Sequence, residues 1–238
     1  MITSKIDNTE YSITQINNWR ESRCPKVRHN LKMSSQIGAD SVSILNEEKA
    51  QMSYDEIICD LKGKLAIGKI GMKLAVLFSF GKRRMAVTHI YATGIHTEVL
   101  GKIIDDLMLN PTEKNRRANL SVCPDHYVLN PHDDTLEVIE TTGNCPVPTQ
   151  FFITFNDETG LQTPRSEDYP YQSVGIAKLR DGTVIGGVRH QFKNTEDGIE
   201  GILTVEFPWL CPASITREHQ KHLAAEWSGW IEWAIDHQ

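Results

Sequence analysis

The chain has 238 residues, of which 39% are hydrophobic and 24% are charged. These values are ordinary for a globular protein with a full core, and the length suits one large domain or a domain with a small appendage. The formal net charge of −6 at pH 7 argues against nucleic acid as the main partner, because phosphate binding requires a basic surface. The short basic run Lys82-Arg83-Arg84 is typical of a solvated turn.

The sequence pattern gives no sign of secretion or membrane insertion. The segment Met1–Ser12 is polar and lacks the apolar core of a signal peptide. The most apolar stretch, Leu65–Phe80, is interrupted by two lysines and is too short to span a bilayer. The five cysteines are scattered and form no Cys-x-x-Cys pair, which disfavours a disulfide framework and a structural cysteine–zinc site. We therefore expect a cytoplasmic protein without a membrane partner.

The first half of the chain has weak periodicity. Residues 1–50 are polar, with few regularly spaced hydrophobic residues, and we interpret them as an N-terminal arm or accessory region ahead of a main domain over residues 51–238. Residues 54–91 suggest helix or mixed structure. The segment 94–110 has apolar residues at helical spacing and predicts a helix that ends at Asn110-Pro111. The residues that set this spacing are Ile95, Val99, Ile103 and Leu107.

After residue 110 the pattern is typical of strands. Leu120 and Val122 alternate with polar neighbours and predict a strand leading to His126. Leu136, Val138 and Glu140 share one face of a strand that is stopped by Gly143. Further strands are expected over 151–155, 174–179, 183–192 and 199–207, and a closing helix over 214–235. This order predicts an α+β fold in which a curved antiparallel sheet holds one long C-terminal helix and encloses a ligand cavity.

The C-terminal helix carries an unusual apolar face. At about 100° per residue, Lys221, Ser228 and Glu232 face away from it and His222 lies at its edge. An unpaired carboxylate among tryptophans is costly, so Glu226 should meet a cation or a metal, or have a shifted pKa. The residues of this face, in order around the helix, are Trp233, Glu226, His219, Trp230, Leu223 and Trp227.

Four polar residues are candidates for one metal site. The spacing His222-x-x-x-Glu226 places both side chains on one helical face, as a shared metal requires, although Glu226 paired with a buried arginine or lysine is an equal alternative on spacing alone. Glu140 ends an apolar strand face, and His126 shares the parity of Leu120 and Val122. A solvated glutamate and a structural histidine are the alternatives for these two positions.

His190 is a candidate for proton transfer. It shares a strand face with Val184, Val188 and Phe192, which would turn its side chain toward the cavity. It could then be a general acid or base, or a buried structural histidine.

Several short segments, in the same order, resemble the diacetylphloroglucinol and phloretin hydrolases. They include Cys123-Pro124-Asp125-His126, Val138-Ile139-Glu140-Thr141-Thr142-Gly143 and His222-Leu223-Ala224-Ala225-Glu226, together with Gly94–Val99, Asn110-Pro111 and Val188–Gly198. The resemblance implies a Bet v 1-like helix-grip fold and a zinc ion bound by His126, Glu140, His222 and Glu226. It further implies hydrolysis of a carbon–carbon bond beside an aryl ketone, with His190 near the substrate.

These observations favour a metal-dependent hydrolase acting on an acyl-phenol or related polyketide-like molecule. The metal would polarise the acyl carbonyl and acidify a water, and His190 could protonate the ring carbon. Two histidines and two carboxylates also suit iron, manganese or cobalt. A metal-dependent lyase, decarboxylase or isomerase, a metal-free binding module, and a nucleophilic cysteine enzyme using Cys123 and His126 are the alternatives. A homodimer is one assembly that the sequence leaves open.

Overall fold

The computed structural model describes residues 1–35 and 41–238 and has a mixed α+β architecture. Its nine strands form an antiparallel sheet in the order β2-β1-β3-β9-β8-β7-β6-β5-β4. The strands are β1 (Ile2–Ile6), β2 (Thr9–Ser12), β3 (Arg83–Thr93), β4 (His126–His132), β5 (Thr135–Glu140), β6 (Thr149–Phe155), β7 (Tyr171–Lys178), β8 (Val184–Asn194) and β9 (Gly198–Pro208). The helices are α1 (Ile13–Asn30), α2 (Ser41–Gln51), α3 (Tyr54–Ser79), α4 (Thr97–Leu109), α5 (Glu113–Ser121) and α6 (Ala213–Asp236).

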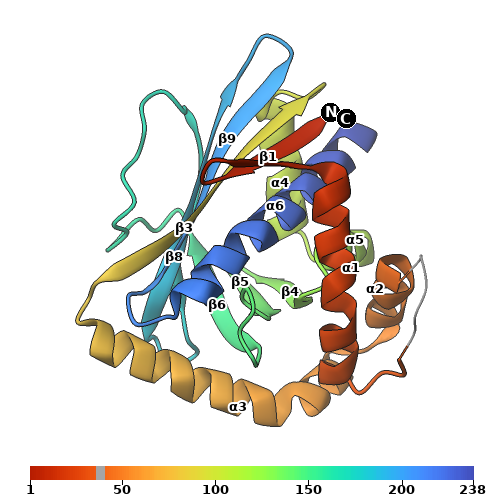
Figure 1. The fold of residues 1–238 in the computed structure, drawn as a ribbon, viewed down its shortest axis with the longest axis vertical. Helices are drawn as coiled ribbons and strands as arrows, with labels where there is room; N and C mark the ends of the chain where they lie inside the picture. The colour runs from red at the N-terminus through yellow and green to blue at the C-terminus, as the bar shows by residue number, and fades with distance from the viewer. Residues whose placement is uncertain (36–40) are drawn as a thin grey trace.

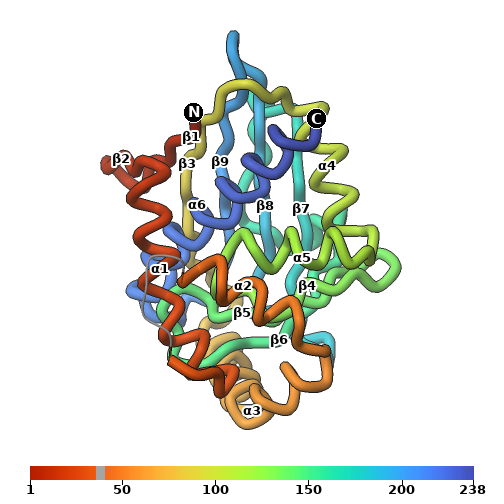
Figure 2. The backbone as a smooth tube through the Cα atoms, turned by 90° about the vertical axis from the view of Figure 1, so that its right-hand side faces the viewer, coloured from red at the N-terminus to blue at the C-terminus, as the bar shows by residue number. Residues whose placement is uncertain are grey.

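Helix α6 runs obliquely across one face of the curved sheet (Figure 1). Helices α1, α2 and α5 lie on the side of α6 that faces away from the sheet, and α3 lies along one end of the molecule (Figures 1 and 2). The main core fills the space between the sheet and α6, where Phe192 and Leu203 meet Leu223, Trp227 and Ile231. This arrangement turns one face of α6 toward the concave side of the sheet.

The α+β class and most of the second half of the chain were predicted correctly. Helix α4, strands β5 to β9 and helix α6 lie within a few residues of their expected bounds. The expected outward face of α6 was wrong at Ser228, which is 1% exposed. It is buried because helices α1 and α5 cover the side of α6 that faces away from the sheet.

The strand predicted through Leu120 and Val122 was wrong, because residues 113–121 form helix α5. Thr112 caps this helix by accepting a hydrogen bond from the backbone N–H of Asn115 at 3.1 Å. Two alternating apolar residues are too few to distinguish a strand from a helix. His126 is consequently the first residue of β4 and follows a helix and a short loop.

Residues 1–50 do not form an arm or accessory region in the parts that the structure describes. Strand β1 pairs with both β2 and β3 inside the sheet. Helix α1 begins at a capping box formed by Ser12 and Gln15, and its Ile16 and Trp19 belong to the main core. The segment is polar because α1 and α2 make many of their contacts through buried arginine, asparagine and lysine side chains.

The structure also describes the state of the cysteines and the character of the helices. All five cysteines are free thiols. Among the helices of residues 1–35 and 41–238, none combines the length and apolar character needed to cross a bilayer.

Gly143, in the loop after strand β5, lets this loop approach the first turns of α6. It has φ +54°, and a Cβ atom there would collide with the carbonyl of Ile215 and lie 3.0 Å from the backbone nitrogen of His219. Gly182 also has positive φ, +83°, but no atom lies within 4 Å of its Cβ position. Gly143 therefore meets both a conformational and a packing requirement, whereas Gly182 meets only the first.

We predict that Gly143→Ala destabilises the protein by about 3 kcal/mol or more, from backbone strain and overpacking together. Gly182→Ala, the matched control, should cost only about 1–2 kcal/mol of left-handed strain. Urea denaturation followed by circular dichroism measures both values. Equal losses for the two variants would contradict the close approach of the loop after β5 to α6.

Candidate metal centre

The four side chains predicted as metal ligands converge in the interior. Nε2 of His126 lies 3.1 Å from Nε2 of His222, 3.2 Å from Oε2 of Glu226 and 3.8 Å from Oε2 of Glu140. Nε2 of His222 lies 3.4 Å from the same oxygen of Glu226 and 3.6 Å from that of Glu140. All four residues are at most 8% exposed, so these atoms form a compact buried cluster that could hold a metal ion.

These distances match the edges of a tetrahedron around one small cation. With metal–ligand bonds of about 2.0–2.1 Å, ideal tetrahedral ligands lie about 3.3–3.4 Å apart. The five distances given above range from 3.1 to 3.8 Å. The donor set of two imidazole nitrogens and two carboxylate oxygens is also one that zinc accepts. These five separations are therefore compatible with a tetrahedral divalent ion.

Contacts behind the cluster orient both imidazoles for metal binding. Nδ1 of His126 lies 3.1 Å from the backbone carbonyl of Asn119, which can only accept a hydrogen bond. Nδ1 of His222 lies 3.8 Å from Sγ of Cys123. A proton on Nδ1 of each ring would leave the lone pair of Nε2 directed toward the cluster, which is the usual arrangement behind a metal-binding histidine.

Neither carboxylate has a lysine or arginine within 4.0 Å among the residues that the structure describes. Burial raises the pKa of Glu140, and the neighbouring charge of Glu226 raises it further, against the opposing effect of the two histidines. Burial also acts to raise the pKa of Glu226, but its hydrogen bonds with His126 and His222 hold the pKa well below its usual range. A divalent cation would stabilise both carboxylates as anions.

The β4–β5 hairpin brings His126 and Glu140 together. Its pairs from Leu129 opposite Val138 outward follow a regular antiparallel register, but an irregularity between His126 and Val128 places His126 opposite Glu140. Without this bulge the regular register would place Tyr127 opposite Glu140, and His126 would lie on the other face of the sheet. The bulge is therefore what aims His126 at the cluster.

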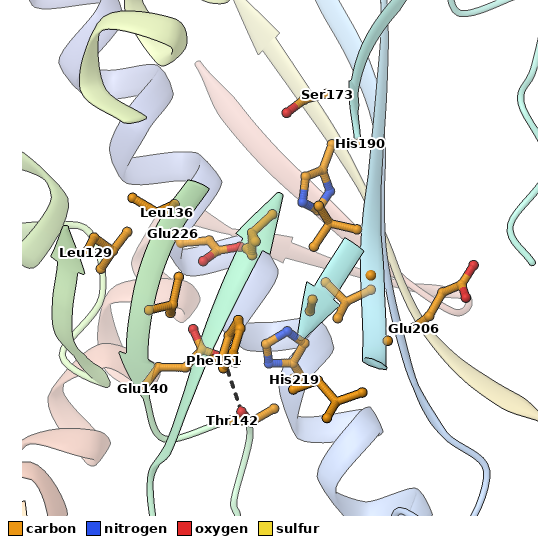
Figure 3. A pocket seen from close by; sticks show the side chains of 18 of the residues that line it. Leu129, Leu136, Glu140, Thr142, Phe151, Ser173, His190, Glu206, His219 and Glu226 are labelled. Carbon is orange, nitrogen blue, oxygen red and sulfur yellow. Dashed lines mark hydrogen bonds between the residues drawn. The ribbon is translucent and has the colours of Figure 1, made fainter. Parts of the chain in front are cut away.

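Helix α6 supplies the other half of the site from one face. His219, His222 and Glu226 follow one another at intervals of three and four residues, so they lie along the same side of the helix. Figure 3 shows His219 and Glu226 directed toward the space between α6 and the sheet, with Glu140 nearby. The metal candidates thus come from two rigid elements, one hairpin and one helix.

Three buried cations from the N-terminal helices hold the loop before His126. The ammonium of Lys49, which is 0% exposed, donates to the carbonyls of Leu120, Cys123, Pro124 and His126 at 3.0–3.3 Å. Arg20 donates to the carbonyl of Val122 at 3.1 Å. Arg23 forms an ion pair with Asp125 at 2.7 Å and also donates to the carbonyl of Gly143 at 2.7 Å. We call Arg20, Arg23 and Lys49 the cation clamp.

An apolar cavity opens beside the cluster. The space in it that no protein atom fills is about 940 Å³, which includes open solvent at its mouth. Its apolar walls come from the β4–β9 strands, α3, α4 and α6, and its polar groups include His126, Glu140, Glu226, His190 and His219. Apolar side chains in the wall include Met72, Leu129, Leu136, Phe151, Trp227 and Trp230.

His190 projects into this cavity from β8 but belongs to no set of clustered ligand atoms in the described residues. Its ring packs edge-on against Trp227, with the ring centroids 5.1 Å apart, and its Nδ1 is buried without a hydrogen-bond partner in the described part of the chain. Burial lowers its pKa to about 4, opposed in part by the charge of Glu226. At neutral pH the imidazole is therefore uncharged.

Several residues of the site were assigned no role by the sequence pattern. His219 lines the cavity, and its Nδ1 also lacks a hydrogen-bond partner in the described residues; the spacing His219-x-x-His222-x-x-x-Glu226 could have indicated it. The role of Lys49 could not be predicted from the sequence, because its carbonyl partners lie more than 70 residues away in the chain. Cys123, considered as a nucleophile with His126, contacts Nδ1 of His222 instead.

Comparison with known proteins adds little to this description. No protein-family model matches the chain, and no curated protein matches it. Among solved structures, the crystal structure of protein Ms6760 from Mycobacterium smegmatis is similar at a TM-score of 0.31 and 14% sequence identity. The match covers 63% of this chain and 86% of that chain, and at this TM-score it does not define a common fold.

We predict that Lys49→Met lowers the free energy of unfolding by about 3 kcal/mol or more, because four buried carbonyls lose a charged donor. Lys62→Met, an exposed change on α3, is the control and should stay within about 0.5 kcal/mol of the parent protein. Urea denaturation measures both. A loss for Lys49→Met as small as that of the control would mean that the clamp does not hold the loop.

His190 should make stability depend on pH. Its pKa is lowered from 6.5 to about 4 in the folded state, so the unfolded chain takes up a proton first as the pH falls. Stability is then complete above about pH 6.5 and is lost between about pH 6.5 and pH 4. Between pH 7 and pH 5 the parent protein should lose about 2 kcal/mol more than His190→Gln. Parallel losses in urea denaturation would contradict a neutral buried His190.

Proposed function

We propose that this protein is a zinc-dependent hydrolase with a helix-grip fold that cleaves a carbon–carbon bond beside the carbonyl of an acyl-phenol or related polyketide-like molecule. The observation that carries the proposal is the buried cluster of two imidazoles and two carboxylates, without a lysine or arginine partner in the described residues, at the wall of an apolar cavity. The sequence resemblance to the diacetylphloroglucinol and phloretin hydrolases supports the choice of reaction.

The fold proposal rests on the relation of the sheet to α6. The curved antiparallel sheet wraps one long C-terminal helix and leaves a cavity between them, which is the arrangement that the resemblance implies. The additional helices α1, α2 and α3 cover the outside of this unit. They supply the cation clamp and Met72 of the cavity wall, so they would be part of the enzyme and not an appendage.

Zinc is proposed over iron, manganese and cobalt because the distances between the donor atoms suit a tetrahedral ion, whereas the other metals more often take higher coordination numbers. A bound zinc ion supplies a Lewis acid for the acyl carbonyl and lowers the pKa of a water molecule. Four protein ligands are more than the usual three of a catalytic zinc site. Glu140, whose contacts of 3.6 and 3.8 Å with the two histidines are the longest of the five distances, would be the ligand least closely held by the other three.

The cavity walls would position the substrate. Phe151, Trp227 and Trp230 offer apolar and aromatic surface for a phenol ring and exclude bulk water. In the overall reaction water divides between the two fragments. Its hydroxyl joins the acyl carbon to give a carboxylic acid, and its other proton goes to the ring carbon as the carbon–carbon bond breaks.

His190 is suited to move that proton. Because its pKa is about 4, it is neutral at rest and must accept a proton before it can give one. It would take the proton released by the attacking water and deliver it to the ring carbon. Trp227 packs against its ring and restricts its orientation.

The metal proposal is tested by the metal content of purified variants. The parent protein should contain about one zinc per chain, and Glu226→Ala should lower the affinity for zinc by at least about 10–100-fold. Glu232→Ala, a change of the same residue type on the exposed side of α6, should retain the metal. Elemental analysis after dialysis measures this. Equal zinc in both variants, or none in the parent protein, would reject the site and favour a metal-free binding module.

The reaction is tested by product analysis with an acyl-phloroglucinol. The parent protein should release the deacylated phenol and the carboxylic acid, and His190→Gln should retain zinc but lower turnover by roughly 10²–10⁴-fold. Unchanged turnover with intact metal would remove His190 from the mechanism. Carbon dioxide or a rearranged isomer as product would instead identify a decarboxylase or an isomerase.

A further inference from the structure

Helix α3 has two apolar faces. Its inner face carries Ile57 and Leu61, which are buried in a small core cluster, and Met72, which lines the cavity. At about 100° per residue the opposite face carries a second apolar stripe. The large residues of this stripe are 49–63% exposed: Ile67, Ile70, Leu74, Leu77 and Phe78.

The stripe continues beyond the end of the helix. Phe80, just after α3, is 84% exposed, and the backbone N–H of Leu210 donates to Oγ of Ser79 at 2.9 Å. This hydrogen bond fixes the loop with Trp209 and Leu210, which are 50% and 52% exposed, next to the end of α3. We call the stripe and these three residues the outer α3 face. Helix α3 itself lies along one edge of the molecule (Figure 1).

A concentration of exposed apolar side chains on one part of a surface marks an interaction site. Of the 13 large hydrophobic side chains that are exposed in the described residues, eight belong to the outer α3 face. Scattered single residues would need no explanation, but this concentration on one helix and its adjoining loop does.

The charge around the outer α3 face identifies the occupant. Residues 61–84 contain seven lysines and arginines and no acidic residue, whereas the rest of the chain has 18 basic and 31 acidic residues. Lys62, Lys69 and Lys73 lie beside the apolar stripe on the helix, and the last two are paired in part with Asp181. The guanidinium of Arg84 lies over the ring of Trp209 at 4.5 Å.

An apolar stripe bordered by lysines, with a tryptophan at its end, is the pattern of a helix that lies in a membrane interface. The lysine stems can follow the apolar stripe while their ammonium groups reach anionic headgroups. A second copy of the chain is a poorer match, since a symmetric contact would bring the same lysines toward one another.

We propose that the outer α3 face docks this protein on an anionic membrane surface. Because α3 also contributes Met72 to the cavity wall, docking would bring the cavity to within about one helix diameter, roughly 10 Å, of the lipid. The site would then draw lipophilic molecules that partition into the membrane. This proposal replaces the sequence-based expectation of no membrane partner, and it holds whatever reaction the metal centre performs.

Flotation with lipid vesicles tests the proposal. The full chain should bind vesicles of phosphatidylcholine and phosphatidylglycerol in equal parts at least about tenfold more strongly than vesicles of phosphatidylcholine alone. The double variant Leu74→Asp/Leu77→Asp should lose this binding at least about tenfold. The control Leu109→Asp, a leucine of similar exposure on α4 (46%, against 49% for Leu74), should bind as the parent does.

Charge is tested in the same assay. Lys62→Glu should weaken binding to the anionic vesicles several-fold, whereas Lys102→Glu, on exposed α4 surface, should not. Circular dichroism melts confirm that each variant is folded. Failure of the parent protein to bind anionic vesicles would overturn the proposal. So would analytical ultracentrifugation that shows a dimer converted to a monomer by Leu74→Asp/Leu77→Asp, since the outer α3 face would then be a contact between two copies.

Discussion

The burial of two carboxylates and two imidazoles against one another is the constraint on which the rest of this structure depends. Like-charged Glu140 and Glu226 are enclosed together, and neither has a lysine or arginine partner in the described residues. A bound cation would offset the cost of that burial, and without one the carboxylates would compete for protons. The hairpin register, the face of α6 and the glycine that joins them all serve to hold these four groups within a few ångströms.

The cation clamp shows how the molecule supports this constraint from behind. Helices α1 and α2 insert three positive charges into the interior, and all three act on the loop or the strand end that carries His126 and Glu140. Without these three cations, several buried carbonyl oxygens of the loop would have no hydrogen-bond donor. The polar N-terminal segment is therefore essential to the position of the first candidate ligand, although none of its described residues, 1–35 and 41–50, lines the cavity.

Helix α3 links the interior to the surface. Its inner face contributes Met72 to the cavity wall. Its outer α3 face is apolar, and basic residues lie along that face in an otherwise acidic chain. An apolar cavity and an apolar, basic exterior on the two sides of one helix are consistent features if the ligand itself is lipophilic. In the proposed function, the four clustered side chains would hold the metal ion, and the surrounding apolar surface would select which molecules reach it.

The sequence by itself determined the elements with strong periodicity and the inward face of α6, because hydrophobic spacing depends only on local geometry. It also identified His126, Glu140, His222 and Glu226 as candidate ligands, all four through the resemblance. For Glu140, His222 and Glu226 the strand or helix that had been predicted is present in the structure. The sequence-based prediction was wrong at residues 113–121, where two alternating apolar residues were interpreted as a strand. It was also wrong for the described part of residues 1–50, where a polar composition was interpreted as an accessory region. Only the tertiary structure decided that a bulge turns His126 inward, that Lys49 holds the loop before it, and that α3 leaves an apolar face uncovered. These features arise from contacts between distant parts of the chain, which no local pattern encodes.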